Sequence, residues 1–276
     1  MSWKNTAAVI LLLLLALLAA NYVELPANLG ALDFRAYWSA SRLLTQSQDF
    51  SDSDLLLRLQ RDLTGSNNPF VMKTWNPPWV LTWLIPYALL PFRQAVFLWL
   101  LTNIGLLFAA VVIGWRLIGQ GAAAARPYGY PLLMAVAFPS TLVALLYGQV
   151  NILVMAGLIF FLWFESRRQD AAAGVALALV TCKPHLVYLT LPIILLHLLR
   201  ERRWRTLAAA AAALMLSTAV VFVLRPTFLG EFFGSSAGGD LFQWETATLS
   251  TYLSLKLGWP AVRLVGVLLL PLTAAV

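Results

Sequence analysis

Four polar residues stand out in this sequence because each lies beside or within a long apolar segment. Asp33 follows the first apolar segment, and Lys183 is the one residue among Asp, Glu, Lys and Arg between positions 171 and 199. Gln149 and Asn151 interrupt an uncharged segment. Polar groups at membrane depth are costly unless they line a cavity or find partners. Their placement therefore predicts one shared polar site.

Asp33 and Lys183 are the two residues with the clearest chemistry. A carboxylate such as Asp33 acts as a general base when it accepts the proton of an attacking hydroxyl. Its structural alternative is an N-cap for the helix that follows. The Lys183 ammonium would neutralise a phosphate as a point charge, and its structural alternative is a lysine that reaches to the membrane interface.

The other candidate residues have equally plain structural alternatives. Gln149 and Asn151 are suited to hydrogen bonds with a sugar, or they satisfy the backbone at a tight turn. Trp75 and Asn76 would form a platform for a sugar face, or they belong to an interfacial aromatic belt. His185 follows Lys183 closely, and a single histidine beside a helix start is more often structural than catalytic.

Metal and nucleotide signatures are weak in this chain. Asp52-Ser53-Asp54 has the D-x-D pattern of some transferases, but it directly precedes an apolar helical pattern and is interpreted as helix-capping acids. The sequence holds no P-loop, no G-x-G-x-x-G and no metal-spaced histidine pair. We therefore expect no metal site and no cofactor. Cys182 is the single cysteine, which excludes an internal disulfide.

Composition identifies the class of protein that must position these residues. Of the 276 residues, 61% are hydrophobic and 11% are charged, whereas soluble domains average about 25% charged residues. This predicts an all-α polytopic membrane protein. The formal charge of +7 comes largely from short basic clusters beside apolar segments, a pattern that reports membrane topology rather than nucleic-acid binding.

The apolar segments and the basic clusters together predict a topology. Spans are expected at residues 5–23, 94–115 and 206–224, two crossings at 127–164, and a hairpin of two short helices at 171–199 with its tip at Lys183-Pro184. The proline-rich segment 75–91 is expected to be re-entrant or surface-lying. The basic residues near the ends of these segments would be cytoplasmic; they are Lys4, Arg116, Arg126, Arg167, Arg168, Arg200, Arg202, Arg203 and Arg205.

With this orientation the N-terminus is cytoplasmic and the polar site is extracytoplasmic. Residues 24–75 form a first outer loop, with interfacial helices from Asp33 and over residues 55–63. Residues 225–258 form a second outer loop. We expect residues 1–276 to be a single transmembrane domain. Because the chain stops inside an apolar segment that begins at Leu264, we also expect the natural protein to continue further.

Several short motifs, taken in order, resemble those of a known family. They are Asp33-Phe34-x-x-Tyr37-Trp38-x-Ala40, Trp75-Asn76-Pro77-Pro78, Gly148-Gln149-Val150-Asn151, Gly174 to Lys183-Pro184, and Arg202-Arg203-Trp204-Arg205. Their order and spacing, over about residues 21–204, are similar to those of glycosyltransferase family 87. Its members are polyprenol-phosphate-mannose-dependent α-(1→2)-mannosyltransferase-like proteins of the GT-C superfamily.

The resemblance implies a GT-C-like helix bundle in the plasma (inner) membrane and a lipid-linked sugar donor. It implies that Asp33 is the general base of an inverting transfer of a hexose, with mannose expected, to a glycolipid or glycan. Lys183 would hold the donor phosphate, and we add Arg93 to that role. The residues expected to bind substrate are Arg35, Tyr37, Trp75, Asn76, Gln149, Asn151 and His185.

Two other classes of function compete with a transferase. A transporter or flippase of lipid-linked sugars would typically show repeated halves and broken helices. The sequence has no internal repeat and no Asp or Glu inside a predicted span. The other alternative is a membrane scaffold without catalytic activity.

Overall fold

The computed structural model describes residues 32–64, 70–118, 129–237 and 254–258. All regular structure within these ranges is helical, so the prediction of an all-α membrane protein is confirmed. The span expected at residues 5–23 and the apolar segment from Leu264 lie outside the described residues.

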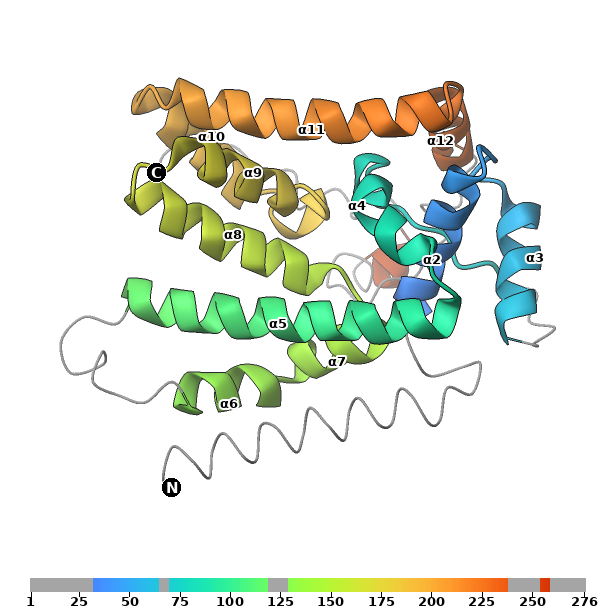
Figure 1. Ribbon diagram of the computed structural model, residues 1–276, viewed down its shortest axis with the longest axis horizontal. Coiled ribbons are helices and arrows are strands. Elements are labelled where there is room, and N and C mark those ends of the chain that lie inside the picture. Colours follow the sequence, from blue (N-terminus) through green and yellow to red (C-terminus); the bar gives the residue numbers. More distant parts are fainter. Residues whose placement is uncertain (1–31, 65–69, 119–128, 238–253, 259–276) are drawn as a thin grey trace.

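Four helices pack side by side in a row (Figure 1). α5 (Phe92–Ile118) contacts α8 (Asn151–Ser166), α8 contacts α9 (Asp170–Val180), and α9 contacts α11 (Trp204–Leu224). Every helix of the row is dominated by apolar residues, which favours burial on both sides of the two central helices. This row is the frame that holds the candidate site.

Glycines allow the central helices of the row to approach closely. A Cβ added at Gly174 in α9 would lie 2.6 Å from Ala209 Cβ and 2.7 Å from the backbone nitrogen of Ala210 in α11. A Cβ added at Gly157 in α8 would lie 2.9 Å from Leu179 Cβ in α9. Small residues are the usual means by which membrane helices bring their backbones together.

Three helices close one end of the row. α4 (Trp79–Ala88) contacts α2 (Leu32–Thr45), α5 and α11, and α3 (Ser53–Thr64) packs on α2. Trp83 Nε1 donates a 2.8 Å hydrogen bond to the hydroxyl of Ser217, which ties α4 to α11. The α2 face is buried, and its Phe34 ring stacks on Trp99 of α5 at a centroid distance of 5.4 Å.

Helix lengths agree with most of the predicted segments. Among the described helices, α5 and α11 are each long and apolar enough to cross a membrane, which confirms the spans expected at residues 94–115 and 206–224. α4 has only 10 residues, too few for a span, as the proline-rich segment predicts. α3 confirms the helix predicted over residues 55–63.

The hairpin expected at residues 171–199 is also present. α9 is followed by a 3-10 turn at Pro184–Leu186 and then by α10 (Thr190–Arg200). Arg203, just after α10, forms an ion pair with Asp170 at the start of α9. The chain therefore returns to the point where the hairpin began, with Lys183 at its tip.

Two features depart from the sequence prediction. The first crossing expected within residues 127–164 is a pair of helices, α6 (Gly129–Ala137) and α7 (Pro139–Tyr147), bent by 67°. Proline begins the second helix because it cannot continue the hydrogen bonding of the first. The predicted loop 225–258 contains a helix, α12 (Phe228–Ala237), whose first turn is held by the Glu231 carboxylate, which accepts hydrogen bonds from Arg225 and Thr227.

The predicted basic clusters gather at one end of the row. α5 and α8 run in the same direction, since Trp99 contacts Gly148 just before α8 and a Cβ on Gly114 would lie 3.5 Å from Ile159. The same end therefore carries the last residues of α5 and α8 and the first residues of α11 (Figure 1). The described basic residues there are Arg116, Arg167, Arg168, Arg200, Arg202, Arg203 and Arg205.

Candidate functional site

A chain of hydrogen bonds joins three of the predicted polar residues at the other end of the row. The Lys183 ammonium donates to Asn151 Oδ1 at 2.9 Å, and Asn151 Nδ2 donates to Gln149 Oε1 at 2.6 Å. Lys183 follows the last turn of α9, and Asn151 begins α8. Two segments 32 residues apart thus meet in one polar cluster.

The turn that carries Gln149 is held by an aromatic side chain. Gly148 ends α7 with φ 66°, a left-handed conformation that favours glycine. Trp99 Nε1 donates a 2.8 Å hydrogen bond to the Gly148 carbonyl. Because Phe34 stacks on the Trp99 ring, the same contact places the start of α2, where Asp33 lies, beside this turn.

Asp33 is half-buried in the first turn of α2. Burial lowers the pKa of Lys183, and the negative charge of Asp33 opposes this by raising it. No hydrogen bond or salt bridge joins Asp33 to another residue in the described ranges.

Tyr37 lies one helical turn after Asp33 and is 4% exposed. Burial raises the pKa of its phenol, and the nearby charge of Asp33 raises it further. The phenol therefore stays protonated at neutral pH and keeps its hydrogen as a donor. Arg35 is half-buried in the same turn, but a spacing of two residues places it on another face of the helix.

Asn76 connects the segment before α4 to the turn that carries Lys183. Asn76 is 7% exposed, and its Nδ2 donates a 2.7 Å hydrogen bond to the Cys182 carbonyl. Trp79 Nε1 donates to Thr181 Oγ1 at 3.1 Å. These two contacts fix the backbone on the N-terminal side of Lys183, so the ammonium is held in place from both α8 and α4.

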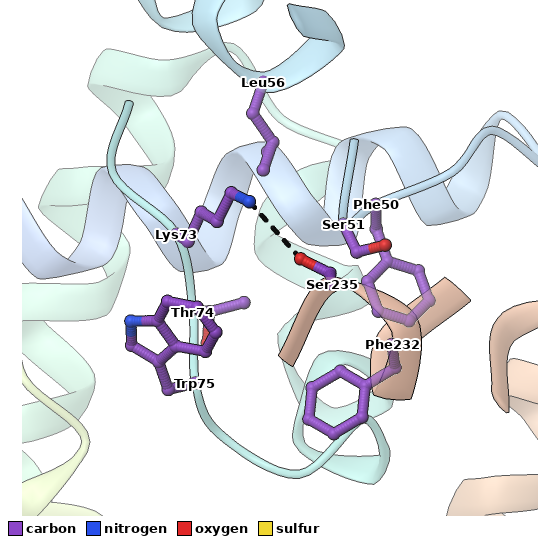
Figure 2. A pocket seen from close by; sticks show the side chains of 8 residues that line it. All are labelled: Phe50, Ser51, Leu56, Lys73, Thr74, Trp75, Phe232 and Ser235. Atoms are coloured by element: carbon purple, nitrogen blue, oxygen red, sulfur yellow. Dashed lines mark hydrogen bonds between the residues drawn. The ribbon is translucent and has the colours of Figure 1, made fainter. Parts of the chain in front are cut away.

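The remaining predicted residues lie around this cluster rather than within its hydrogen bonds. His185 is exposed, two residues after Lys183. Arg93 is exposed in the first turn of α5. Trp75 lines a separate pocket with Lys73 and Phe232, shown in Figure 2.

The D-x-D sequence acts as the predicted helix cap. Asp52 Oδ1 accepts hydrogen bonds from the backbone nitrogens of Asp54 at 2.8 Å and Leu55 at 3.0 Å. These contacts satisfy amide groups that have no partner inside the first turn of α3. In the part of the chain that the structure describes, no group of three or more His, Cys, Asp or Glu is arranged around a common point.

Sequence reasoning missed the residues that support the cluster. Trp99, Thr181 and the Cys182 carbonyl fix its geometry through contacts to Gly148, Trp79 and Asn76. A tryptophan inside an apolar span and a backbone carbonyl carry no pattern that distinguishes them from ordinary core. The one sequence feature that points to Thr181 and Cys182 as supporting residues is their position directly before Lys183.

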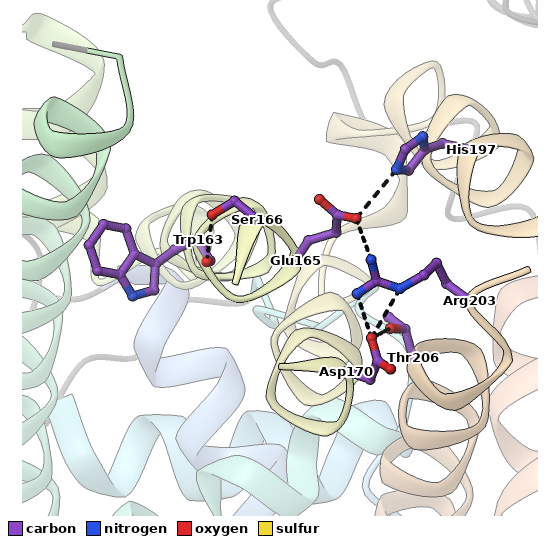
Figure 3. Close-up of polar contacts among 7 residues, drawn as sticks. All are labelled: Trp163, Glu165, Ser166, Asp170, His197, Arg203 and Thr206. Carbon is purple, nitrogen blue, oxygen red and sulfur yellow. Dashed lines mark hydrogen bonds and ion pairs between the residues drawn. The ribbon is translucent and has the colours of Figure 1, made fainter. Parts of the chain in front are cut away.

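A second polar cluster lies at the basic end of the same helices (Figure 3). Arg203 is 5% exposed and donates a hydrogen bond from Nη1 to Glu165 Oε1 at 2.9 Å. Arg203 also binds the Asp170 carboxylate, and His197 Nε2 lies 3.6 Å from Glu165 Oε1. This cluster joins the end of α8 to the starts of α9 and α11.

The helices and their two polar clusters define an all-α membrane protein with a half-buried polar site at one end. Residues 74–276 match the sequence profile of Glycosyltransferase family 87. Since the match spans more than half of the chain, the protein belongs to glycosyltransferase family 87, as the motifs predict. The matched range includes Asn76, Gln149, Asn151 and Lys183, and it begins after Asp33. No curated protein and no solved structure matches the chain.

Proposed function

We propose that the protein transfers a hexose, with mannose as the expected sugar, from a polyprenyl-phosphate donor to a hydroxyl of a glycolipid or glycan. The reaction takes place at the extracytoplasmic face of the plasma (inner) membrane. The observation that carries this proposal is the polar cluster in which the Lys183 ammonium is held by Asn151. The contacts of Trp99 with Gly148 and Phe34 place this cluster beside the start of α2, where Asp33 lies.

The proposed reaction is a single displacement. The acceptor oxygen forms a bond to the anomeric carbon while its proton passes to the Asp33 carboxylate, because an unassisted hydroxyl is a weak nucleophile. The bond between the anomeric carbon and the phosphate oxygen breaks, and its electron pair leaves with the phosphate. Attack from the face opposite the leaving group inverts the anomeric centre.

The neighbouring side chains have supporting roles in this proposal. Lys183 stabilises the charge that develops on the departing phosphate, and its hydrogen bond to Asn151 positions it. Gln149, Asn151, Asn76 and the Tyr37 phenol supply donors and acceptors for sugar hydroxyls. Further contacts to substrate come from the residues at the edge of the cluster, Arg35, Trp75 and His185, with Arg93 beside the donor phosphate.

The positions of the charges support the proposed orientation. The arginines at the end of α5, at the end of α8 and at the start of α11 lie at the end of the row opposite Asp33 and Lys183; they are Arg116, Arg167, Arg168, Arg203 and Arg205. At the site end, Arg93 begins α5 and Arg225 follows α11. Basic residues near short loops favour the cytoplasmic side. With those arginines in the cytoplasm, the site faces outward.

The test uses purified full-length protein in proteoliposomes with radiolabelled polyprenyl-phosphate-mannose and a membrane glycolipid extract. We expect wild-type protein to transfer label and Asp33→Asn to lose transfer while it still binds the donor. Asp62→Asn, an exposed acid on α3, is the matched control and should transfer at the wild-type rate.

A flippase would give a different result in the same vesicles. Labelled lipid would move between leaflets, and neither wild-type protein nor Asp33→Asn would raise glycolipid labelling above background. That result, or equal transfer by wild-type protein and Asp33→Asn, would overturn the assignment of Asp33 as the base.

A further inference from the structure

The basic end of the row carries exposed arginines that have no role in the chemistry proposed above. Arg202 lies in the turn between α10 and α11, Arg205 lies in the first turn of α11, and Arg168 lies in the turn between α8 and α9. No hydrogen bond or salt bridge joins these three side chains to another residue in the described ranges. Their guanidinium groups therefore remain open to a ligand.

The partly buried acids at this end already have a cation. Arg203 donates hydrogen bonds to both Glu165 and Asp170, as Figure 3 shows. Because Arg203 contacts the end of α8 and the start of α9, the two turns that carry Arg168 and Arg202 lie next to each other. Glu201 is the one exposed acid in these two turns. The surface that they form is therefore net positive.

Two indoles place these charges at the level of lipid headgroups. Trp204 directly precedes Arg205 and is 60% exposed at the start of α11. Trp163 lies near the end of α8, and the guanidinium carbon of Arg167 lies 3.1 Å from the centroid of its ring. Tryptophan is enriched where a membrane helix meets the headgroup region. The arginines beside these indoles therefore lie where the phosphates of a bilayer lie.

The face of α11 that continues from Arg205 is apolar and exposed. Ala208, Ala212 and Leu216 follow Arg205 at helical spacing and are all exposed. Buried residues make up only 17% of the most apolar 18-residue window of α11. The rise from Arg205 to Leu216 is about 16 Å, close to half of a hydrocarbon core about 30 Å thick. The length of this face therefore matches the acyl chains of one leaflet.

The charge and the apolar face together select one class of ligand. Guanidinium groups bind phosphate oxygens through paired hydrogen bonds, and basic residues at a membrane surface attract anionic lipids. A soluble anion would leave the apolar face of α11 without a contact. A zwitterionic lipid carries a cation of its own, which the arginines would repel. An anionic lipid satisfies both parts of the surface.

We infer that this end of the protein binds an anionic phospholipid. Its phosphate lies at Arg202 and Arg205, with Arg168 beside them, and its acyl chains lie along the exposed face of α11. The surface stands at the end of the row opposite Asp33 and Lys183, so the inference does not depend on the proposed transfer reaction.

Native mass spectrometry of the purified full chain in a mild detergent measures the binding directly, because each bound lipid adds its own mass. The probes are phosphatidylglycerol and phosphatidylcholine with identical acyl chains, which differ in net charge. We expect wild type to bind phosphatidylglycerol at least about tenfold more tightly. Inorganic phosphate at the same concentration should displace neither lipid, because it makes no contact with α11.

Substitution of the arginines tests where the headgroup lies. We expect Arg205→Gln to weaken phosphatidylglycerol binding about fivefold, the usual contribution of one basic residue at a lipid surface, and to leave phosphatidylcholine binding unchanged. The double variant Arg202→Gln/Arg205→Gln should lose the preference between the two lipids. Arg205→Lys should keep most of it, because the positive charge is retained.

Arg58→Gln is the matched control, since Arg58 is an exposed arginine on α3. It should bind both lipids as wild type does. Because all of these positions are exposed, each variant should melt within about 2 °C of wild type in detergent alone, which separates lost binding from lost folding.

Four outcomes would overturn the inference. They are equal binding of the two lipids by wild type, equal phosphatidylglycerol binding by wild type and the double variant, and equal losses in Arg205→Gln and Arg58→Gln. The fourth is displacement of phosphatidylglycerol by inorganic phosphate, which would show that the arginines bind a free anion instead of a lipid.

Discussion

The Lys183 ammonium and the Asn151 side chain form a 2.9 Å hydrogen bond that joins the end of α9 to the start of α8. The other ends of these two helices are joined by Arg203, which binds both Glu165 and Asp170. Asn151 and Glu165 lie 14 residues apart in α8, so the two connections stand about 21 Å apart. Polar contacts at both ends of the pair hold the position of Lys183.

The first prediction concerns the charge of Lys183. Replacement by methionine keeps the length of the side chain but removes the ammonium that faces the departing phosphate. We expect Lys183→Met to lower the rate of transfer about 100- to 1000-fold, the usual effect of losing one group that stabilises transition-state charge. Asn151→Leu should lower it less, by about tenfold, because the ammonium remains but loses its positioning bond.

The measurement is initial-rate kinetics with labelled donor in proteoliposomes. Lys183→Arg is expected to keep more activity than Lys183→Met because the positive charge is retained. Arg200→Met, an exposed cation at the opposite end of the row, serves as the control. A wild-type rate for Lys183→Met would remove Lys183 from the donor site.

The second prediction concerns the close contact of α9 with α11. Gly174→Ala inserts a methyl group against Ala209 and Ala210 at distances that require the backbones to separate. Overpacking of this kind costs about 1–3 kcal/mol, which corresponds to a fall in Tm of roughly 2–12 °C for a chain of this size. Thermal unfolding in detergent measures it.

The matched control for this substitution is Gly105→Ala in α5. A Cβ at Gly105 meets nothing within 4 Å, and alanine favours a helix more than glycine does. Its Tm should be equal to or slightly above that of wild type. If both variants lost stability equally, the close packing of α9 and α11 would not be the cause.

Much of the fold could be predicted from the sequence because apolar length is a local property. Uninterrupted apolar segments and their flanking arginines predict the α5 and α11 spans. They also predict the hairpin with Lys183 at its tip. The 67° bend before Pro139 was not predicted, because a proline inside an apolar segment is compatible with either a kink or a break. Part of the predicted loop 225–258 is helical, and the contact of Arg225 with Glu231 holds the first turn of that helix.

The candidate site was predictable in its members and less so in its geometry. The sequence groups Gln149, Asn151 and Lys183 because each is a polar residue that interrupts an apolar segment. The structure joins the three by hydrogen bonds. Trp75 and Asn76 are adjacent and were grouped together. In the structure Asn76 contacts the turn that carries Lys183, and Trp75 lines the separate pocket with Lys73 and Phe232, because neighbouring side chains in an extended segment point to opposite sides.

The third prediction concerns the buried cation at the basic end. Arg203 is 5% exposed and contacts Glu165 and Asp170 (Figure 3). Arg203→Leu would leave two carboxylates facing each other without a cation, and loss of one partner in a buried ionic cluster is strongly destabilising. We expect Tm to fall by roughly 6–20 °C, with the donor KM unchanged in the protein that remains folded.

Arg200→Leu is the control for this variant, since Arg200 is exposed at the end of α10. Its Tm should stay within about 2 °C of wild type because exposed charges contribute little. Comparable losses in both variants would contradict a specific role for the Arg203 cluster in joining α8, α9 and α11.

The fourth prediction is a pH dependence of stability at α12. Hydrogen bonds from Arg225 hold the pKa of the Glu231 carboxyl below its ordinary value, and the same contact raises the pKa of Arg225. Arg225 Nη1 also donates to the Ser47 carbonyl at 2.9 Å, so this ion pair fastens α12 to the turn after α2. Protonation of Glu231 would weaken both connections.

The direction of this pH dependence follows from the lowered pKa of Glu231. A carboxyl with a lower pKa in the folded state adds stability at neutral pH, and this contribution disappears as the pH falls through the folded-state pKa. We expect the Tm of wild type to drop more steeply below about pH 4.5 than that of Glu231→Gln. At pH 7 the variant should melt about 2–4 °C lower, a modest effect because both side chains are partly exposed.

Glu201→Gln provides the matched comparison, because Glu201 is an exposed acid at the end of α10. Its melting curve should follow wild type at every pH, including the steep fall in acid. Parallel curves for wild type and Glu231→Gln would show that the pair with Arg225 adds nothing to stability.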